Sequence, residues 1–292
     1  MLRSILVALD DTPGAKAARD AAFALSRRSG ATLTAAVVLD RPHTQSEHEF
    51  VPIGGAAFKA RRDAALAKRA AEDATVALAE CAQAAAGHPY AELQLDDAPE
   101  PALLRAGATH DLLVIGRDST LGLEATEDGV APVIERLLMD GARPLLVIPP
   151  NSGPPNSGPP NCVPAGSVPE EGPVLVGYDA SIPAMAALQL FALLGMGEGA
   201  PVRVASAAET REAALAMAEE ACSYLRRHGL DATPLALVGD RPADLLLAEA
   251  EGLRARLLVV GSYEESGLRR LLTGSATHVL LQRATCPVFI HH

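Results

Sequence analysis

The feature of this sequence that most constrains its fold is an internal repeat. A short apolar run followed by aspartate lies within residues 5–11 and again within 174–180, where the aspartates are Asp10 and Asp179. Two further landmarks recur in the same order, a run ending in glycine and a closing run that follows a proline: residues 111–116 and 256–261, then 143–148 and 286–290. Continuous apolar runs of this length are typical of strands buried on both faces. Three landmarks in one order predict two copies of one domain in a single chain.

A proline- and glycine-rich segment separates the two copies. Residues 151–161 repeat one five-residue unit, NSGPP, and the same composition continues to about residue 172. Proline and glycine at this density disfavour both helix and sheet, so the segment is predicted to be a semi-extended tether. We therefore predict a first domain over residues 1–150, a linker over 151–172 and a second domain over 173–292.

Helical signals follow each aspartate-ended run. Thr12 is a suitable N-cap with Pro13 at the first helical position, and Ser181 opens the corresponding helix of the second copy. Further apolar strands then alternate with alanine-rich helices, which we expect at 58–86, 100–109, 209–228 and 242–252. Such alternation predicts an α/β protein of two tandem, doubly wound, five-stranded parallel sheets of the Rossmann-like type. Ligands of these sheets bind beyond the carboxyl ends of the strands, near Asp10 and Asp179.

Charge and cysteine content exclude several classes of partner. The formal net charge of −11 argues against nucleic acid, whose recognition needs clustered Lys and Arg. No apolar run approaches the roughly 20 residues that span a bilayer, and the first residues lead directly into a strand without a signal peptide. The four cysteines lack metal-ligand spacing and are interpreted as free thiols: Cys81, Cys162, Cys222 and Cys286. We therefore expect a cytoplasmic protein with no membrane partner and no metal site of its own.

One segment of the second copy carries a family resemblance. From Gly261 to Ser275 the chain reads GSYEESGLRRLLTGS, and it then continues to a closing strand that begins Cys-Pro-Val. This resembles the universal stress protein signature G-x2-G-x9-G-[ST], and the Val-Gly-Tyr-Asp of the first strand extends the resemblance over nearly the whole second copy. The first copy matches in layout and in its first strand. The chain thus resembles a tandem universal stress protein, with the adenine-nucleotide α-hydrolase-like fold.

The resemblance implies that ATP, accompanied by Mg²⁺, lies over the strand ends of the second copy. By this implication Asp179 contacts the nucleoside, and Gly261 lets backbone amides approach the phosphates. Gly274 and Ser275 would add donors at the start of a helix. Elementary chemistry agrees, because glycine permits close backbone approach and a helix N-terminus favours anions. These four residues are the candidate nucleotide-binding residues.

The sequence departs from the signature in both copies. Glu264 stands where the second glycine is expected, and a carboxylate about 4 Å from a phosphate charge costs roughly 4 kcal/mol at an effective dielectric near 20. A bridging Mg²⁺ or a rotated side chain would offset this repulsion. In the first copy Ser119 and Val130 replace the middle glycine and the final Ser/Thr, and the loop between them is acidic. We expect no ATP there, and Asp10 is interpreted as a turn and helix-capping residue.

Two functional hypotheses of different classes follow. The first is a nucleotide-dependent sensor or regulator of the stress response that binds ATP through its second domain. The second is a structural or protein-interaction module of the same fold without nucleotide. No nucleophile elbow or dinucleotide motif is present, so we expect no catalytic residue and at most a weak ATPase activity. His278 is interpreted as a surface or half-buried residue of the last helix.

The closing strands suggest a partner within the chain. In the family that this sequence resembles, the corresponding edge strands pair antiparallel across a two-fold interface, and an apolar edge left bare is an aggregation hazard. We predict that residues 145–149 of the first domain pair with residues 288–291 of the second. The sequence leaves open whether two chains associate further into a homodimer.

Overall fold

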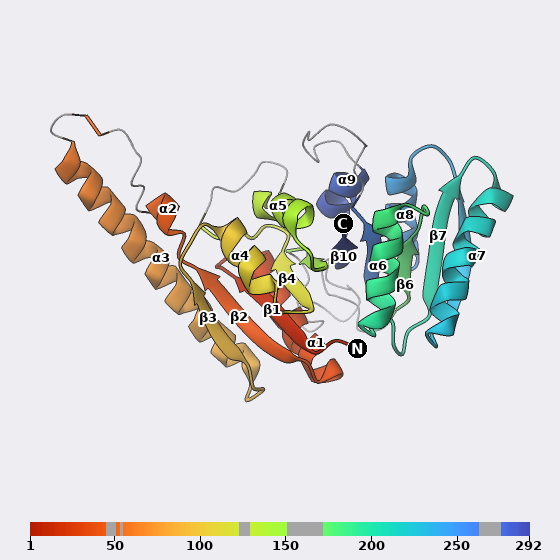
Figure 1. The fold of residues 1–292 in the computed structure, drawn as a ribbon, viewed down its shortest axis with the longest axis horizontal. Helices are drawn as coiled ribbons and strands as arrows, with labels where there is room; N and C mark the ends of the chain where they lie inside the picture. Colours follow the sequence, from red (N-terminus) through yellow and green to blue (C-terminus); the bar gives the residue numbers. More distant parts are fainter. Residues whose placement is uncertain (45–50, 53–54, 123–128, 151–171, 263–275) are drawn as a thin grey trace, which may run out of the picture.

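A computed structural model describes residues 1–44, 51–52, 55–122, 129–150, 172–262 and 276–292. Figure 1 shows two α/β units side by side, the first half of the chain (residues 1–150) and the second half (residues 173–292). Most of the predicted linker, residues 151–171, lies outside the described residues.

The first half alternates strands and helices as its apolar runs predict. Its strands run in the spatial order β3-β2-β1-β4-β5 and are all parallel. Thr12 caps the first helix through its side chain, as expected, and Gly30 ends that helix in the left-handed conformation. The elements are β1 (Ser4–Leu9), α1 (Pro13–Ser29), β2 (Thr32–Val38), α2 (Arg41–Thr44), α3 (Ala56–Ala85), β3 (Ala91–Leu95), α4 (Pro99–Gly107), β4 (Leu112–Gly116), α5 (Pro132–Asp140) and β5 (Leu145–Ile148).

The second half repeats this arrangement with shorter connections. Its strands lie in the corresponding order β8-β7-β6-β9-β10, again parallel. Ser181 is the N-cap of its first helix, the predicted role. The elements are β6 (Val174–Gly177), α6 (Ile182–Leu193), β7 (Val202–Ala208), α7 (Arg211–Arg227), β8 (Ala232–Val238), α8 (Pro242–Gly252), β9 (Leu257–Gly261), α9 (Ala276–Arg283) and β10 (Val288–His291).

Helices cover both faces of the sheet and bury its inner strands. One apolar core lies under α1, α3, α6 and α7, and a second lies under α4, α5, α8 and α9. Each core contains residues from both halves of the chain, so the halves share their interior across the junction. Among the described residues, no helix combines the length and apolar character needed to cross a membrane.

The two halves meet at the predicted strand pair. β5 and β10 run antiparallel, with Val147 opposite Val288 and Leu146 opposite Phe289, and they join the two parallel sheets into one sheet of ten strands. The chain start adds a second contact, because the amide of Leu2 donates to the carbonyl of Leu194 at the end of α6, 3.0 Å away. The closing strands of the two halves therefore cover each other, while β3 and β8 form the outer edges of the sheet.

Three buried cysteines give a first testable prediction. Cys81, Cys222 and Cys286 are free and buried, and desolvation raises the pKa of each thiol to about 11. At about pH 8 the thiolate fraction of such a group is on the order of one in a thousand. We expect iodoacetamide to leave all three unmodified in the folded protein and to label all three in concentrated guanidinium, measured by peptide mass spectrometry. Rapid labelling of any of them in the folded protein would contradict this packing.

Candidate functional site

The strand order places the candidate residues at two equivalent points of the sheet. In each half the chain reverses its strand order between the first and the fourth strand, β1 and β4 or β6 and β9, which lie side by side in parallel. The carboxyl ends of these strands lead to Asp10 and Gly116 in the first half. They lead to Asp179 and Gly261 in the second half. This is where doubly wound sheets bind ligands.

Both strand-end glycines make room for the helix that follows the first strand. A Cβ at Gly261 would lie 2.3 Å from the backbone nitrogen of Ala184 and 2.4 Å from the carbonyl carbon of Pro183, in the first turn of α6. A Cβ at Gly116 would lie 2.4 Å from the nitrogen of Ala15 in α1. Gly261 was predicted to let backbone amides approach the phosphates of a nucleotide. The fold requires a glycine at this position before any ligand is considered.

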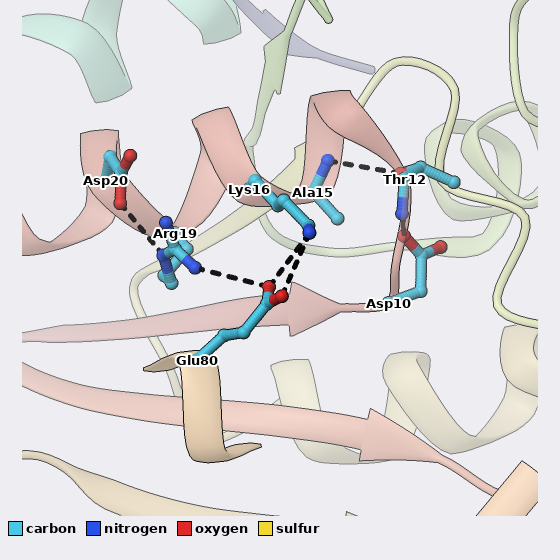
Figure 2. Close-up of polar contacts among 7 residues, drawn as sticks. All are labelled: Asp10, Thr12, Ala15, Lys16, Arg19, Asp20 and Glu80. Carbon is cyan, nitrogen blue, oxygen red and sulfur yellow. Dashed lines mark hydrogen bonds and ion pairs between the residues drawn. The ribbon is translucent and has the colours of Figure 1, made fainter. Parts of the chain in front are cut away.

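The carboxylate of Asp10 is occupied by bonds within the first half. One of its oxygens accepts hydrogen bonds from the amide and the hydroxyl of Thr12, at 2.9 and 2.6 Å, and the other accepts from the amide of Leu121 at 3.0 Å. Figure 2 shows Thr12 in turn capping α1 through the amide of Ala15. Burial raises the pKa of Asp10, and the hydrogen bonds from Thr12 and Leu121 oppose that rise. Asp10 is confirmed as a turn residue, because its carboxylate accepts from the amide of Thr12, but the side chain that caps α1 is that of Thr12.

The chain after β4 fills the same edge of the first half. Leu121 is buried and adopts a positive φ of 50°, which is uncommon for a leucine, and its amide is the donor to Asp10. The carboxylate of Asp118 lies beside Gly14, so close that a Cβ on Gly14 would sit 1.9 Å from its Oδ1. A nucleotide phosphate approaching the start of α1 would meet this carboxylate. These residues do not fit a nucleotide.

The corresponding carboxylate of the second half is open to solvent. Asp179 is exposed, and within the described part of the chain it accepts one hydrogen bond, from the amide of Ser181 at 3.0 Å. Its second oxygen is available to a donor from outside. The structure therefore brings Asp179 and Gly261 to one edge of the sheet, while Gly274, Ser275 and Glu264 lie outside the described residues.

Comparison with known proteins identifies the family. The sequence model of the universal stress protein family matches residues 1–149 and 172–292. The chain belongs to the universal stress protein family.

Individual relatives agree with this assignment. A universal stress protein of Mycobacterium tuberculosis (strain ATCC 25618 / H37Rv) is 30% identical over 137 residues, which are 42% of this chain and 46% of that protein. The universal stress protein YxiE of Bacillus subtilis is 34% identical over 82 residues, 28% of this chain and 55% of that protein. The matches thus span about half the length of these curated relatives.

Solved structures show the same fold over nearly the whole chain. A universal stress protein from Archaeoglobus fulgidus superposes with a TM-score of 0.66, covering 99% of this chain and 95% of that one at 17% identity. A universal stress protein structure from Pseudomonas aeruginosa gives a TM-score of 0.56, with 99% and 93% coverage and 17% identity. At this identity the likeness establishes the architecture alone.

The two universal stress protein repeats contact each other next to the carboxyl end of β4 in the first half. Arg117, directly after β4, donates from its guanidinium to the carbonyls of Leu281 and Ala284 at the carboxyl end of α9, at 3.1 and 2.9 Å. A cation at the end of a helix also interacts favourably with the helix dipole. Burial lowers the pKa of Arg117, and the neighbouring Asp118 opposes that change. The first repeat therefore binds the carboxyl end of α9, the last helix of the second repeat, through Arg117.

The sequence does not predict the contacts of α9 with the first half. His278 is buried, with Nδ1 3.7 Å from Oε1 of Glu135 in α5, so its interpretation as a surface or half-buried residue was wrong. No sequence pattern assigned a role or a partner to Arg117. Its partners lie more than 160 positions further along the chain, and no local pattern reports contacts of that range.

Proposed function

We propose that this universal stress protein binds ATP with Mg²⁺ at the strand edge of its second half and acts as a nucleotide-dependent regulator in the stress response. The observation that carries the proposal is the difference between the two equivalent aspartates. Both carboxylate oxygens of Asp10 accept hydrogen bonds from the protein itself. Asp179 is exposed, and one of its oxygens is available to accept a hydrogen bond from a ligand. A free carboxylate at this position suits the hydroxyl groups of a ribose, since hydrogen bonds to a charged acceptor are among the stronger ones.

The remaining candidates complete the proposed site on the phosphate side. Gly261 ends β9 at the same edge as Asp179, and the proposed donors Gly274 and Ser275 directly precede α9 in the sequence. The far end of α9 is held by Arg117 of the first half. Nucleotide occupancy at the start of α9 would therefore act on a helix that both halves contact. This route from ligand to domain packing is the regulatory part of the proposal.

A binding experiment with matched variants of the two aspartates tests the proposal. We expect titration calorimetry with ATP–Mg²⁺ to give one site per chain. Asp179→Ala should weaken binding by at least about tenfold, which corresponds to about 1.4 kcal/mol. Asp10→Ala should leave the affinity unchanged while lowering the melting temperature, because it removes hydrogen bonds to Thr12 and Leu121.

The opposite results would point to the second candidate function. Absence of binding heat with ATP–Mg²⁺ and absence of ATP in the supernatant of heat-denatured purified protein would contradict the proposal. So would equal losses of affinity in the two aspartate variants. In that case the protein is a structural or interaction module of the same fold. Neither half would then bind a nucleotide at the carboxyl ends of its strands.

A further inference from the structure

The first helix of the second half has an unusual surface. α6 contains no charged residue, and its sequence IPAMAALQLFAL is apolar on nearly every side. Ile182, Met185 and Leu193 are 78%, 37% and 53% exposed, and Gln189, also exposed, lies between them. Their spacing places these four side chains along one stripe of the helix. A helix that is apolar all round is ordinarily buried on all sides.

The equivalent helix of the first half, α1, carries charged side chains on the surface that is apolar in α6. In α1, Lys16 and Arg19 form ion pairs with Glu80 of the long helix α3 (Figure 2). When the halves are aligned on Asp10 and Asp179, Lys16 corresponds to Met185. α7, the counterpart of α3, is 17 residues long, whereas α3 has 30. The polar cover present in the first half is thus replaced by exposed apolar side chains in the second.

The stripe continues into the junction between the halves. The terminal amine of Met1 hydrogen-bonds to the carbonyl of Leu193, and the side chain of Met1 is 67% exposed. Figure 1 shows the chain start beside this end of α6. We call Met1, Ile182, Met185, Gln189 and Leu193 the α6 patch. Its exposed surface is on the order of 400 Å², the size of the largest patch on many monomers and about half of what each partner buries in a stable interface.

The α6 patch is complementary to itself. When two copies of α6 lie antiparallel about a two-fold axis, Ile182 of one copy faces Leu193 of the other, at both ends of a stripe about 16 Å long. The small, half-exposed Ala186 then faces Gln189 near the axis. An amide carries both donors and acceptors, so the two Gln189 side chains can hydrogen-bond to each other there. A charge-free contact also spares two chains of net charge −11 a close approach of like charges.

We propose that the α6 patch is the docking surface for a second copy of this chain. The contact pairs α6 with α6 about a two-fold axis and leaves the ten-stranded sheet of each chain intact. It is independent of nucleotide, so its test does not depend on the proposed ATP site.

Sedimentation velocity on the full-length protein without nucleotide tests the docking surface. At about 50 μM we expect a dimer, and Met185→Lys should raise the dissociation constant at least about tenfold by placing a charge in the centre of the contact. Val76→Lys is the matched control, because Val76 is 54% exposed on α3 of the first half. Circular dichroism melting should show that both variants remain folded.

A charge pair tests the antiparallel register. Ile182→Glu alone should weaken the dimer, and adding Leu193→Lys in the same chain should restore part of the affinity, since the two positions face each other between copies. A monomeric wild-type protein at this concentration would overturn the proposal. So would a dimer that Met185→Lys leaves unchanged or that Val76→Lys weakens equally.

Discussion

Gly261→Ala is expected to lower the free energy of unfolding by about 3 kcal/mol, the upper part of the usual range for overpacking. The added Cβ would lie 2.3 Å from the nitrogen and 2.8 Å from the Cα of Ala184, and 2.4 Å from the carbonyl carbon of Pro183. All three atoms belong to the backbone of α6, so no side chain can rotate away. Either α6 or the end of β9 must shift, and both are packed into the shared cores.

Chemical denaturation of ligand-free protein measures this effect. Gly252→Ala is the matched control, because a Cβ at Gly252, the last residue of α8, meets no atom within 4 Å. We expect that control to change stability by less than about 0.5 kcal/mol. Equal stability of Gly261→Ala and wild type would mean that a glycine is needed here for ligand binding and not for packing against α6. A loss of stability without ligand shows instead that the fold itself selects this glycine.

Local chemistry was sufficient to predict most of the fold. Apolar runs located the strands, and the cap signals at Thr12 and Ser181 located the starts of α1 and α6 within a residue. The repeat added the topology, because strands that alternate with helices permit few arrangements. The pairing of β5 with β10 followed from the resemblance together with the need to cover an apolar edge.

The site was less predictable because its decisive contacts are long-range. The sequence identified the acidic loop after β4 as a poor phosphate site. It did not predict the hydrogen bond from the amide of Leu121 to Asp10, which joins residues 111 positions apart, nor the positive φ of Leu121, which its residue type disfavours. The position of Asp118 against Gly14 and the contact of Arg117 with α9 likewise join distant parts of the chain. A single sequence carries no pattern for such pairs.

Removal of one aromatic ring at the junction should have the largest effect on stability. Phe289→Ala is expected to lower the free energy of unfolding by about 4 kcal/mol, within the range for a fully buried phenylalanine. Phe289 is 0% exposed, lies opposite Leu146 of β5 and meets Phe191 of α6 edge to face, with ring centroids 6.3 Å apart. Truncation would leave a cavity bounded by both halves, since their side chains belong to one core.

The position of Phe289 decides whether the two universal stress protein repeats unfold together. Because the ring belongs to a core that both halves share, hydrogen exchange should accelerate in β4 and β5 of the first half as well as in β9 and β10. Phe58→Ala is the matched control, because Phe58 is 76% exposed on α3 and its truncation should change stability by less than about 0.5 kcal/mol. Accelerated exchange confined to the second half would instead mean that the strand pair joins two independently stable repeats. A shared response makes the junction a path by which a ligand on one half alters the stability of the other.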